Sequence, residues 1–322
     1  MPLHTNLLAS FGVHFSRHRA DIAIPGSPER CLFRRVIEDA DGQLFVLEQL
    51  SPGQSPRREA IARLLSDLSE HGLSGLAPYL RVPATGAFVL QDWGRHWQLS
   101  PFILGVELPR PGYLGDAPLG DSLGAWLMAF RRAADSFSLT SGPPTGLREL
   151  SLPDYIADLL AQLSHVRPDV HARASLSLPA LGGFLEACHE LPRVLSHGDI
   201  HPLNVIWEAH GLRAVIDWEF AGMLPAVYDL ANCLGCLAIE GDGGLDTPFA
   251  RALLSRVRDE GFLPIDQVRW LPPAILATRF GWLSEWLRRG DEEMICMELD
   301  YMTYWAELLE AVGAPRVTLD SI

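Results

Sequence analysis

Short apolar runs separated by turns fill the first hundred residues, and they predict strands around a single helix. Two of these runs flank the turn Asp39-Ala40-Asp41-Gly42, which is typical of a β-hairpin. Leucines then recur at helical spacing over 57–71 and predict a helix there. The strands are expected at 32–37, 44–50, 86–91 and 97–104.

After residue 122 the apolar positions follow mainly helical spacing. The helices are expected at 123–137, 152–163, 179–191, 225–239, 248–260, 264–289 and 292–312. Three short β-rich runs interrupt them, at 194–196, 204–207 and 212–218. Between the first two runs lies a polar loop, so the only strands expected in the helical half frame polar residues.

The length of the chain and its pattern together predict two lobes. A chain of 322 residues with 48% hydrophobic content can bury more than one compact pair of layers usually holds. Pro and Gly crowd 109–120, which indicates a joint. We therefore predict an α+β protein with a small β-rich lobe over 1–104 and a larger, mainly helical lobe over 105–322.

The net charge of the chain limits which classes of partner it is expected to bind. A formal net charge of −14 argues against nucleic acid, because phosphate backbones are bound by surplus Arg and Lys. A cationic or amine-bearing small molecule suits this balance better, although many soluble enzymes are acidic for solubility alone. The sequence contains no apolar stretch of about 18 residues, so no membrane association is expected. A monomer or a homodimer is the expected assembly.

The five cysteines are scattered and odd in number, which suits a reducing compartment and predicts a cytoplasmic protein. Cys233 and Cys236 form a C-x-x-C in an apolar run without a second pair. This arrangement indicates helix packing and not a zinc site.

The polar loop carries the residue types that phosphoryl transfer requires. The reaction needs a carboxylate near the attacking hydroxyl and two oxygen ligands that hold Mg²⁺ against the phosphates. Asp199 can supply the first, and Asn204 with Asp217 the second. Four residues between Asp199 and Asn204 let the loop turn back, while the hairpin 205–216 brings Asp217 beside them. We therefore predict transfer of a phosphoryl group from ATP or GTP, with Mg²⁺, to an alcohol.

Three motifs in order resemble the aminoglycoside phosphotransferase and choline kinase family, which includes homoserine and methylthioribose kinases. They are His197-Gly198-Asp199 with Asn204, Ile216-Asp217-Trp218-Glu219, and Asp229-Leu230-Ala231, which Asn232 extends. The resemblance covers about 27–231 and implies the bilobal protein-kinase-like fold. It also implies that His197 braces the loop from beneath and that Asp229 anchors the loop backbone. His201 we expect to face solvent or substrate.

The chain departs from the family pattern at the residues that bind the phosphates of the nucleotide. The family carries a Lys on the third strand, paired with a Glu on the following helix. Here Glu48 stands in the place of that Lys, Glu59 best matches the helix Glu, and the chain contains no Lys at all. Three explanations stay open: the alignment is shifted, an Arg has taken over the charge, or activity has been lost. The candidate arginines are Arg30, Arg34, Arg35 and Arg58.

We expect the small lobe to bind both the phosphates and the base of the nucleotide. Arg30, Arg35 and Glu59 are the candidates near the phosphates, and Pro101 and Ile103 those near the base, which backbone groups of 100–105 would read. The turn 25–30 is poor in glycine, so it predicts a phosphate cover no better than an ordinary hairpin turn.

The last helices offer an acceptor site. Trp282, Glu285, Trp286 and Tyr301 bring aromatic faces and a carboxylate together, and such groups bind an ammonium by cation–π contact. Ordinary helix packing explains the same spacing. His201 and Glu219 are further candidates for binding the acceptor.

Two other functions compete with a kinase. The segment Gly198-Asp199-Ile200-His201 resembles the Asp-x-His opening of dinuclear metallophosphoesterases, but their further metal-binding blocks are missing from the sequence. The missing Lys also suits a catalytically impaired kinase-like protein that binds a nucleotide or metabolite as a regulatory or scaffold module. The preferred prediction is an ATP- and Mg²⁺-dependent phosphotransferase acting on a small metabolite or an aminoglycoside-like compound.

Overall fold

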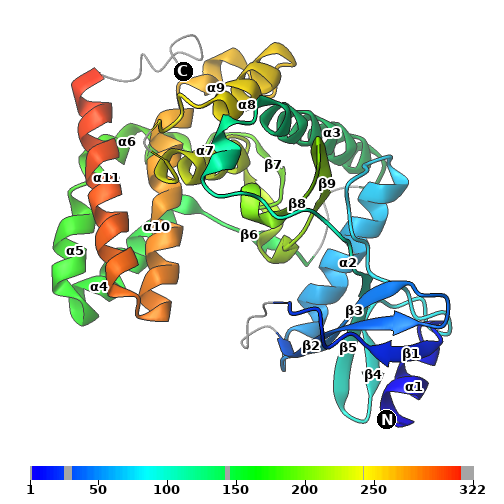
Figure 1. The fold of residues 1–322 in the computed structure, drawn as a ribbon. Coiled ribbons are helices and arrows are strands. Elements are labelled where there is room, and N and C mark those ends of the chain that lie inside the picture. Colours follow the sequence, from blue (N-terminus) through cyan, green and yellow to red (C-terminus); the bar gives the residue numbers. More distant parts are fainter. Residues whose placement is uncertain (1, 25–30, 142–145, 242, 313–322) are drawn as a thin grey trace. The chain divides into compact units, whose positions relative to one another are not determined.

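A computed structural model describes residues 2–24, 31–141, 146–241 and 243–312 (Figure 1). The N-terminal part contains a five-stranded antiparallel sheet in the order β1-β2-β3-β5-β4. Its strands are β1 (Phe15–His18), β2 (Cys31–Asp39), β3 (Leu44–Leu50), β4 (Leu90–Asp92) and β5 (Arg95–Pro101). The predicted hairpin between 32 and 50 is confirmed.

The alternation of side chains along β3 places Glu48 on the opposite face from two residues of the core, Phe45 and Leu47. Phe45 and Leu47 point to a core that α1 (Pro2–Ala9) shares through Leu7 and Leu8. Because successive side chains of a strand point to opposite faces, Glu48 lies on the other face of the sheet. It is nevertheless buried, with 2% of its surface exposed.

Helix α2 (Ser55–Glu70) follows β3 and confirms the helix predicted over 57–71. It begins with a proline in its first turn, where the missing N–H is not needed, and ends before Gly72, whose positive φ of 86° suits glycine. Its buried face consists of Arg58, Ile61, Ala62, Leu64, Leu65 and Leu68. The burial of each large aliphatic side chain stabilises the fold by about 1.5–3 kcal/mol. Arg58 is the exception on this face, since a buried cation needs partners.

The remainder of the chain is mainly helical. The helices are α3 (Ala117–Ser141), α4 (Leu152–Val166), α5 (Pro168–Ser175), α6 (Leu178–Ala187), α7 (Tyr228–Ile239), α8 (Pro248–Asp259), α9 (Ile265–Val268), α10 (Leu271–Arg289) and α11 (Glu292–Val312). In Figure 1, α10 lies beside α11, and both pack with the α4–α6 group. None of the helices that the structure describes is long and apolar enough to cross a bilayer.

Short strands and 3-10 turns frame the polar loop. Strands β6 (Arg148–Glu149), β10 (Gly222–Pro225) and β7 (Arg193–Ser196) form one sheet in this order, and β8 (Val205–Glu208) pairs with β9 (Gly211–Val215). The 3-10 turns are η1 (Gly112–Gly115), η2 (Pro202–Asn204) and η3 (Trp218–Phe220). The predicted strands around the loop and the α+β class are thus confirmed.

Two predicted elements differ from the structure for local reasons. The strand predicted over 86–91 begins only at Leu90, because Val82 and Ala87 close a turn in which Gly86 has φ 73°. The helix predicted over 264–289 is two helices, α9 and α10. Prolines stand in the first turn of α10, and a proline cannot donate the hydrogen bond that would continue the preceding helix.

The chain forms two compact units. Unit 1 comprises 1–106, 132–147 and 206–219, and unit 2 comprises 107–131, 148–205 and 220–322. Unit 1 contains the five-stranded sheet and α2, together with the β8–β9 hairpin as far as Glu219. Unit 2 contains the polar loop up to Val205 and the helices from α4 to α11. The predicted boundary at residue 104 stays a prediction.

Candidate active site

The polar loop of unit 2 begins where β7 ends and brings Asp199 and Asn204 together. The side-chain amide of Asn204 donates to the backbone carbonyl of Asp199 at 2.8 Å and to its carboxylate at 3.1 Å. The 3-10 turn η2 makes this contact, since it folds the chain back within four residues. The Asn204 nitrogen is thereby used within the loop, and its amide oxygen is the atom suited to a cation.

Asp229 anchors the start of the loop. Its carboxylate lies in the first turn of α7 and accepts the backbone N–H groups of His197 and Gly198, each at 2.8 Å. Burial raises the pKa of Asp229 to about 6, although these two hydrogen bonds act in the opposite direction. The His197 ring is completely buried and accepts the N–H of Asp199 at 3.2 Å. The bracing role of His197 and the anchoring role of Asp229, which the resemblance implies, stay predictions that depend on these contacts.

Gly198 is required by the same turn. Its φ of 82° lies in the left-handed region, and a Cβ there would collide with the carbonyl oxygen of Phe220. The glycine of the motif therefore serves the backbone path that presents Asp199.

His201 does not face solvent, which corrects one half of the prediction made for it. It is 7% exposed, packs edge-on against Trp282 with ring centroids 5.5 Å apart, and accepts the N–H of Leu203 at 3.3 Å. Burial lowers its pKa to about 3, so the imidazole is neutral near pH 7. Its Nε2 lies 3.8 Å from the carboxylate of Asp199.

Asn232 connects the loop to the predicted acceptor residues. It donates to the carbonyl of Ile200 at 3.3 Å and accepts the indole N–H of Trp282 at 3.0 Å. The sequence motif alone did not assign this role to Asn232. Its spacing of three residues from Asp229 was the signal, because both then lie on one face of α7.

The aromatic cluster on α10 and α11 already holds an internal cation. The guanidinium of Arg279 lies 5.5 Å from the Trp282 ring and 5.2 Å from the Tyr301 ring, and it pairs with the fully buried Glu298 at 2.6 Å. Glu298 also accepts the indole N–H of Trp286 at 3.3 Å. The helix-packing interpretation thus describes one role of these rings.

Glu285 lies on the exposed side of α10. Its carboxylate accepts hydrogen bonds from Arg288 and Arg289, at 2.7–2.8 Å, and these arginines lower its pKa. An acceptor ammonium would therefore compete with two arginines for this carboxylate.

In unit 1, Asp217 follows β9 in a strained turn. Its φ of 61° is unusual for a residue other than glycine, and the indole N–H of Trp218 donates to the carbonyl of Val215 at 3.2 Å across the turn. Glu219 is 9% exposed, and its carboxylate pairs with Arg58. Arg57 donates to the Glu219 carbonyl at 3.0 Å. Glu219 is thus held by α2, and acceptor binding by Glu219 stays a prediction.

The helix residue that meets Glu48 is Arg58. Both side chains are buried, and they form an ion pair. Glu59, the residue matched to the helix Glu, has other partners. Its carboxylate accepts hydrogen bonds from the backbone N–H groups of Phe88 and Val89 at 2.8 and 2.9 Å. Glu48 and Glu59, the two carboxylates at the positions of the usual Lys–Glu pair, therefore contact different groups.

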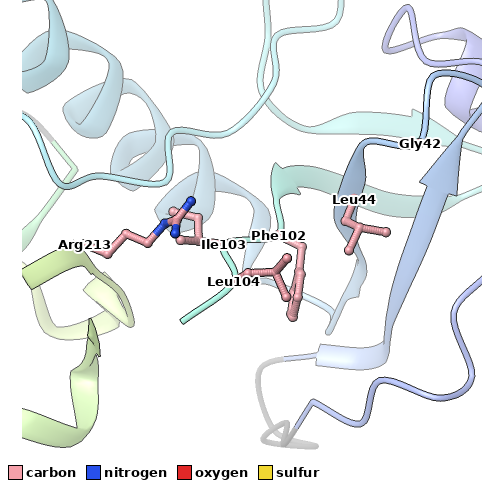
Figure 2. Close-up of a pocket in the computed structure, with 6 residues that line it drawn as sticks. All are labelled: Gly42, Leu44, Phe102, Ile103, Leu104 and Arg213. Carbon is pink, nitrogen blue, oxygen red and sulfur yellow. The ribbon is translucent and has the colours of Figure 1, made fainter. Parts of the chain in front are cut away.

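A pocket of about 410 Å³ in unit 1 includes one of the predicted base-binding residues. Figure 2 shows its lining residues, which come from the β2–β3 turn, from the start of β3, from the segment after β5 and from β9. They are Gly42, Leu44, Phe102, Ile103, Leu104 and Arg213. Pro101 ends β5 opposite Phe45, and Arg35 packs over the Phe33 ring at 5.3 Å. Arg30 and the turn 25–30 lie outside the described residues.

The donor set suits a hard cation that keeps other ligands. Within the described ranges no group of three or more His, Cys, Asp or Glu side chains gathers around one point. Asn204 in unit 2 offers an amide oxygen and Asp217 in unit 1 a carboxylate, and each is a ligand type that Mg²⁺ takes together with waters and substrate phosphates. Coordination of Mg²⁺ by these two residues stays a prediction.

Solved structures with the same fold are phosphotransferases. An amicoumacin kinase in complex with AMP-PNP, Ca²⁺ and its antibiotic superposes with a TM-score of 0.71 over 99% of this chain and 96% of that one, at 15% identity. The GDP complex of aminoglycoside 2'-phosphotransferase-IIIa has a TM-score of 0.66 over 95% and 97% of the two chains, at 16% identity. At these identities the likeness shows the fold, which is the protein-kinase-like fold that the motifs imply.

The family follows from sequence comparison. The model of the phosphotransferase enzyme family matches residues 32–263, and the chain belongs to this family. A homoserine kinase of Gluconacetobacter diazotrophicus is 29% identical over 74% of each chain, and one of Acidiphilium cryptum is 28% identical over 66% of this chain and 65% of its own length. The resemblance inferred from the motifs is confirmed, and the protein is a small-molecule kinase with a hydroxyl acceptor.

Proposed function

We propose that the protein transfers the γ-phosphoryl group of ATP to the hydroxyl of a small amine-bearing metabolite, with homoserine as the first acceptor to test. The observation that carries the proposal is the Asp199–Asn204 contact, held in place by Asp229. A protein that only binds a nucleotide has no need of a positioned carboxylate at this point. The name of the curated relatives and the acidic balance of the chain support an acceptor with an amino group.

In the proposed mechanism, Asp199 accepts the proton of the attacking hydroxyl. The amide of Asn204 fixes the rotamer of that carboxylate, so that it need not reorient during the reaction. Asn204 and Asp217 would hold Mg²⁺ through their oxygens. When bound, the ion neutralises charge on the phosphates. Burial lowers the pKa of His201 to about 3, so its imidazole carries no positive charge beside Asp199 near pH 7.

The donor is proposed to bind along unit 1. The backbone after β5 would read the base, with Pro101 and Ile103 beside it, and the pocket around Ile103 has the apolar lining that a flat ring requires. Arg30 and Arg35 stay candidates for the phosphates. ATP and GTP are both compatible with this site, since structural neighbours were solved with AMP-PNP and with GDP.

The acceptor is proposed to bind in unit 2 on the loop side of Trp282. Asn232 ties this ring to the loop, so a ligand that contacts the indole would lie close to Asp199. Trp286, Tyr301 and Glu285 would complete the surroundings. Arg279 already interacts with two of these rings, so an acceptor that carries a carboxylate as well as an amine suits the cluster better than a simple cation.

Replacing Asp199 by Ala tests the proposal directly. We expect kcat to fall by about 10²–10⁴ with little change in the unfolding transition, because the side chain is a base and not part of the core. The assay incubates the protein with Mg·ATP or Mg·GTP and homoserine, choline, ethanolamine, methylthioribose or an aminoglycoside, and detects product by phosphorus NMR. A matched control is Asp300→Asn, an exposed carboxylate on α11.

Two results would contradict the proposal. An Asp199→Ala variant as active as the parent would remove the mechanism. Nucleotide binding without product from any acceptor would favour the scaffold module, which neither the family nor the relatives favour.

A further inference from the structure

A polar row crosses three strands of the sheet in unit 1. Arg34 on β2 lies opposite Glu48 on β3, and Glu48 lies opposite Gln98 on β5. Directly opposed residues of antiparallel strands place their side chains on the same face. The row therefore faces α2, from which Arg58 reaches it.

The contacts within this row are specific. Arg34 donates to one carboxylate oxygen of Glu48 through Nε at 2.8 Å and through a terminal nitrogen at 2.5 Å. Arg58 pairs with the other oxygen of Glu48 and with Glu219, and its Nε donates to Gln98 at 2.9 Å. Gln98 returns a hydrogen bond to the Arg58 carbonyl at 3.1 Å. Glu48 is thus held between two arginines.

The order of charges is the reverse of that in kinases. There, a strand Lys binds the α- and β-phosphates and a helix Glu positions it. Here the strand carries the acid and the helix the base. Because the chain contains no Lys, no shift of alignment restores the usual pair, and arginine is the remaining side chain with a permanent positive charge.

We propose that Arg34 is the phosphate-binding cation of the donor site, and that Glu48 with Arg58 positions it. This inference rests on the proposed function. Arg58 is too enclosed to bind a phosphate, because only 5% of its side chain is exposed and it is engaged by two carboxylates and by Gln98. Arg34 has 32% of its side chain exposed and emerges from the same cluster. A guanidinium has five donors in a planar fork, so one that already holds a carboxylate can also donate to a phosphate at its exposed surface.

Arg58 has a second positioning effect. Glu219 stands two residues after Asp217, and α2 holds it through the Arg58 ion pair and through the Arg57 contact to its carbonyl. Arg58 therefore positions two parts of the donor site. It orders Glu48, and through it Arg34, and it orders the segment that carries Asp217, the proposed Mg²⁺ ligand.

Equilibrium binding of AMP-PNP with Mg²⁺, measured by calorimetry without any acceptor, tests Arg34 apart from turnover. We expect Arg34→Ala to weaken binding about 10- to 100-fold, since a hydrogen bond between charged groups is lost. Arg34→Lys should retain part of the affinity, because it keeps the charge and loses the fork. Arg17→Ala is the matched control, an exposed arginine of the same sheet paired with Glu38. Arg34→Gln serves if the alanine variant does not fold.

Glu48→Gln tests positioning. It should also weaken nucleotide binding, but only while Arg34 is present, so Arg34→Ala combined with Glu48→Gln should bind no worse than Arg34→Ala alone. A merely structural role of Glu48 would instead add its own loss to the double variant, and that additivity would overturn the positioning role.

The outcomes separate this inference from the proposed function. Wild-type protein that binds no nucleotide would overturn both. Wild-type binding that Arg34→Ala leaves unchanged would overturn the inference and spare the function. Loss of affinity in Arg35→Ala with an unaffected Arg34→Ala would assign the phosphate contact to the neighbouring arginine instead.

Discussion

Replacing Asp229 by Asn should reduce activity far more than stability. The carboxylate accepts the N–H groups of His197 and Gly198, whereas an amide offers one oxygen and turns an NH₂ group toward the other donor. One buried N–H is then unsatisfied, which costs about 1–3 kcal/mol. The loop that presents Asp199 loses one of its two anchors.

An opposing contribution comes from the charge itself. Burial raises the pKa of Asp229 from 3.8 to about 6, so ionisation in the folded state costs about 3 kcal/mol more than in water. The uncharged amide removes this penalty. Above pH 7 the two effects nearly cancel, and we expect the free energy of unfolding to change by less than about 2 kcal/mol. Turnover should nevertheless fall by about 10- to 100-fold, because small displacements of a catalytic group are costly.

The pH dependence gives a second readout with a definite sign. Between about pH 4 and 6 the folded protein binds a proton at Asp229 that the unfolded chain does not, so this residue makes the fold more stable as the pH falls. Turnover should move the other way, because a protonated carboxyl is a weaker acceptor for the loop. The wild-type advantage in kcat over Asp229→Asn should therefore shrink below pH 6.

The assay measures kcat for wild type and Asp229→Asn from pH 5 to 8.5 and, in parallel, unfolding in urea. Asp300→Asn serves as the control, since its carboxylate is exposed on α11. A ratio of wild-type to variant kcat that stays constant across this range, or a fully active variant at pH 8, would refute the anchoring role.

Two further substitutions probe the same unit. Gly198→Ala should lower the free energy of unfolding by about 2–4 kcal/mol, because the positive φ is strained and the new Cβ collides with Phe220. The control Gly290→Ala has a positive φ but open space around it, so it should lower the free energy of unfolding by only about 1 kcal/mol in the same denaturant titration. Equal losses would show that the collision does not matter. Glu298→Gln should lower the free energy of unfolding by about 3–5 kcal/mol, because it leaves Arg279 buried without a counter-charge. The double variant Arg279→Met with Glu298→Leu should recover much of that stability. A Glu298→Gln variant as stable as wild type would contradict the importance of the buried pair.

The chemistry of the loop could be predicted because it is local. Asp199 and Asn204 are separated by four residues, and a turn of that length is short enough to bring them into contact. The hairpin around 39–42 and the helix α2 were equally accessible, since turn residues and helical spacing are short-range signals. Elements of only a few residues, such as β1 and β6, carry too little pattern to be recognised.

The partners of buried charges could not be predicted in this way. Glu48 was recognised as the residue in the place of the Lys, but the choice between Arg58 and Glu59 depends on the rotation of α2 against the sheet. A rotation by one residue, about 100°, would turn Glu59 toward the sheet in place of Arg58. Spacing within the chain does not determine that rotation.

What the sequence determined by itself is therefore the reaction class, through motifs whose members lie close together along the chain. The tertiary structure decided which charges meet: Arg58 with Glu48 and Glu219, and Arg279 with Glu298 among the aromatic rings. These pairs join residues up to 161 positions apart. The physical reason is that a buried charge requires a counter-charge within a few ångströms, and only the packing of helices and strands determines which one lies there.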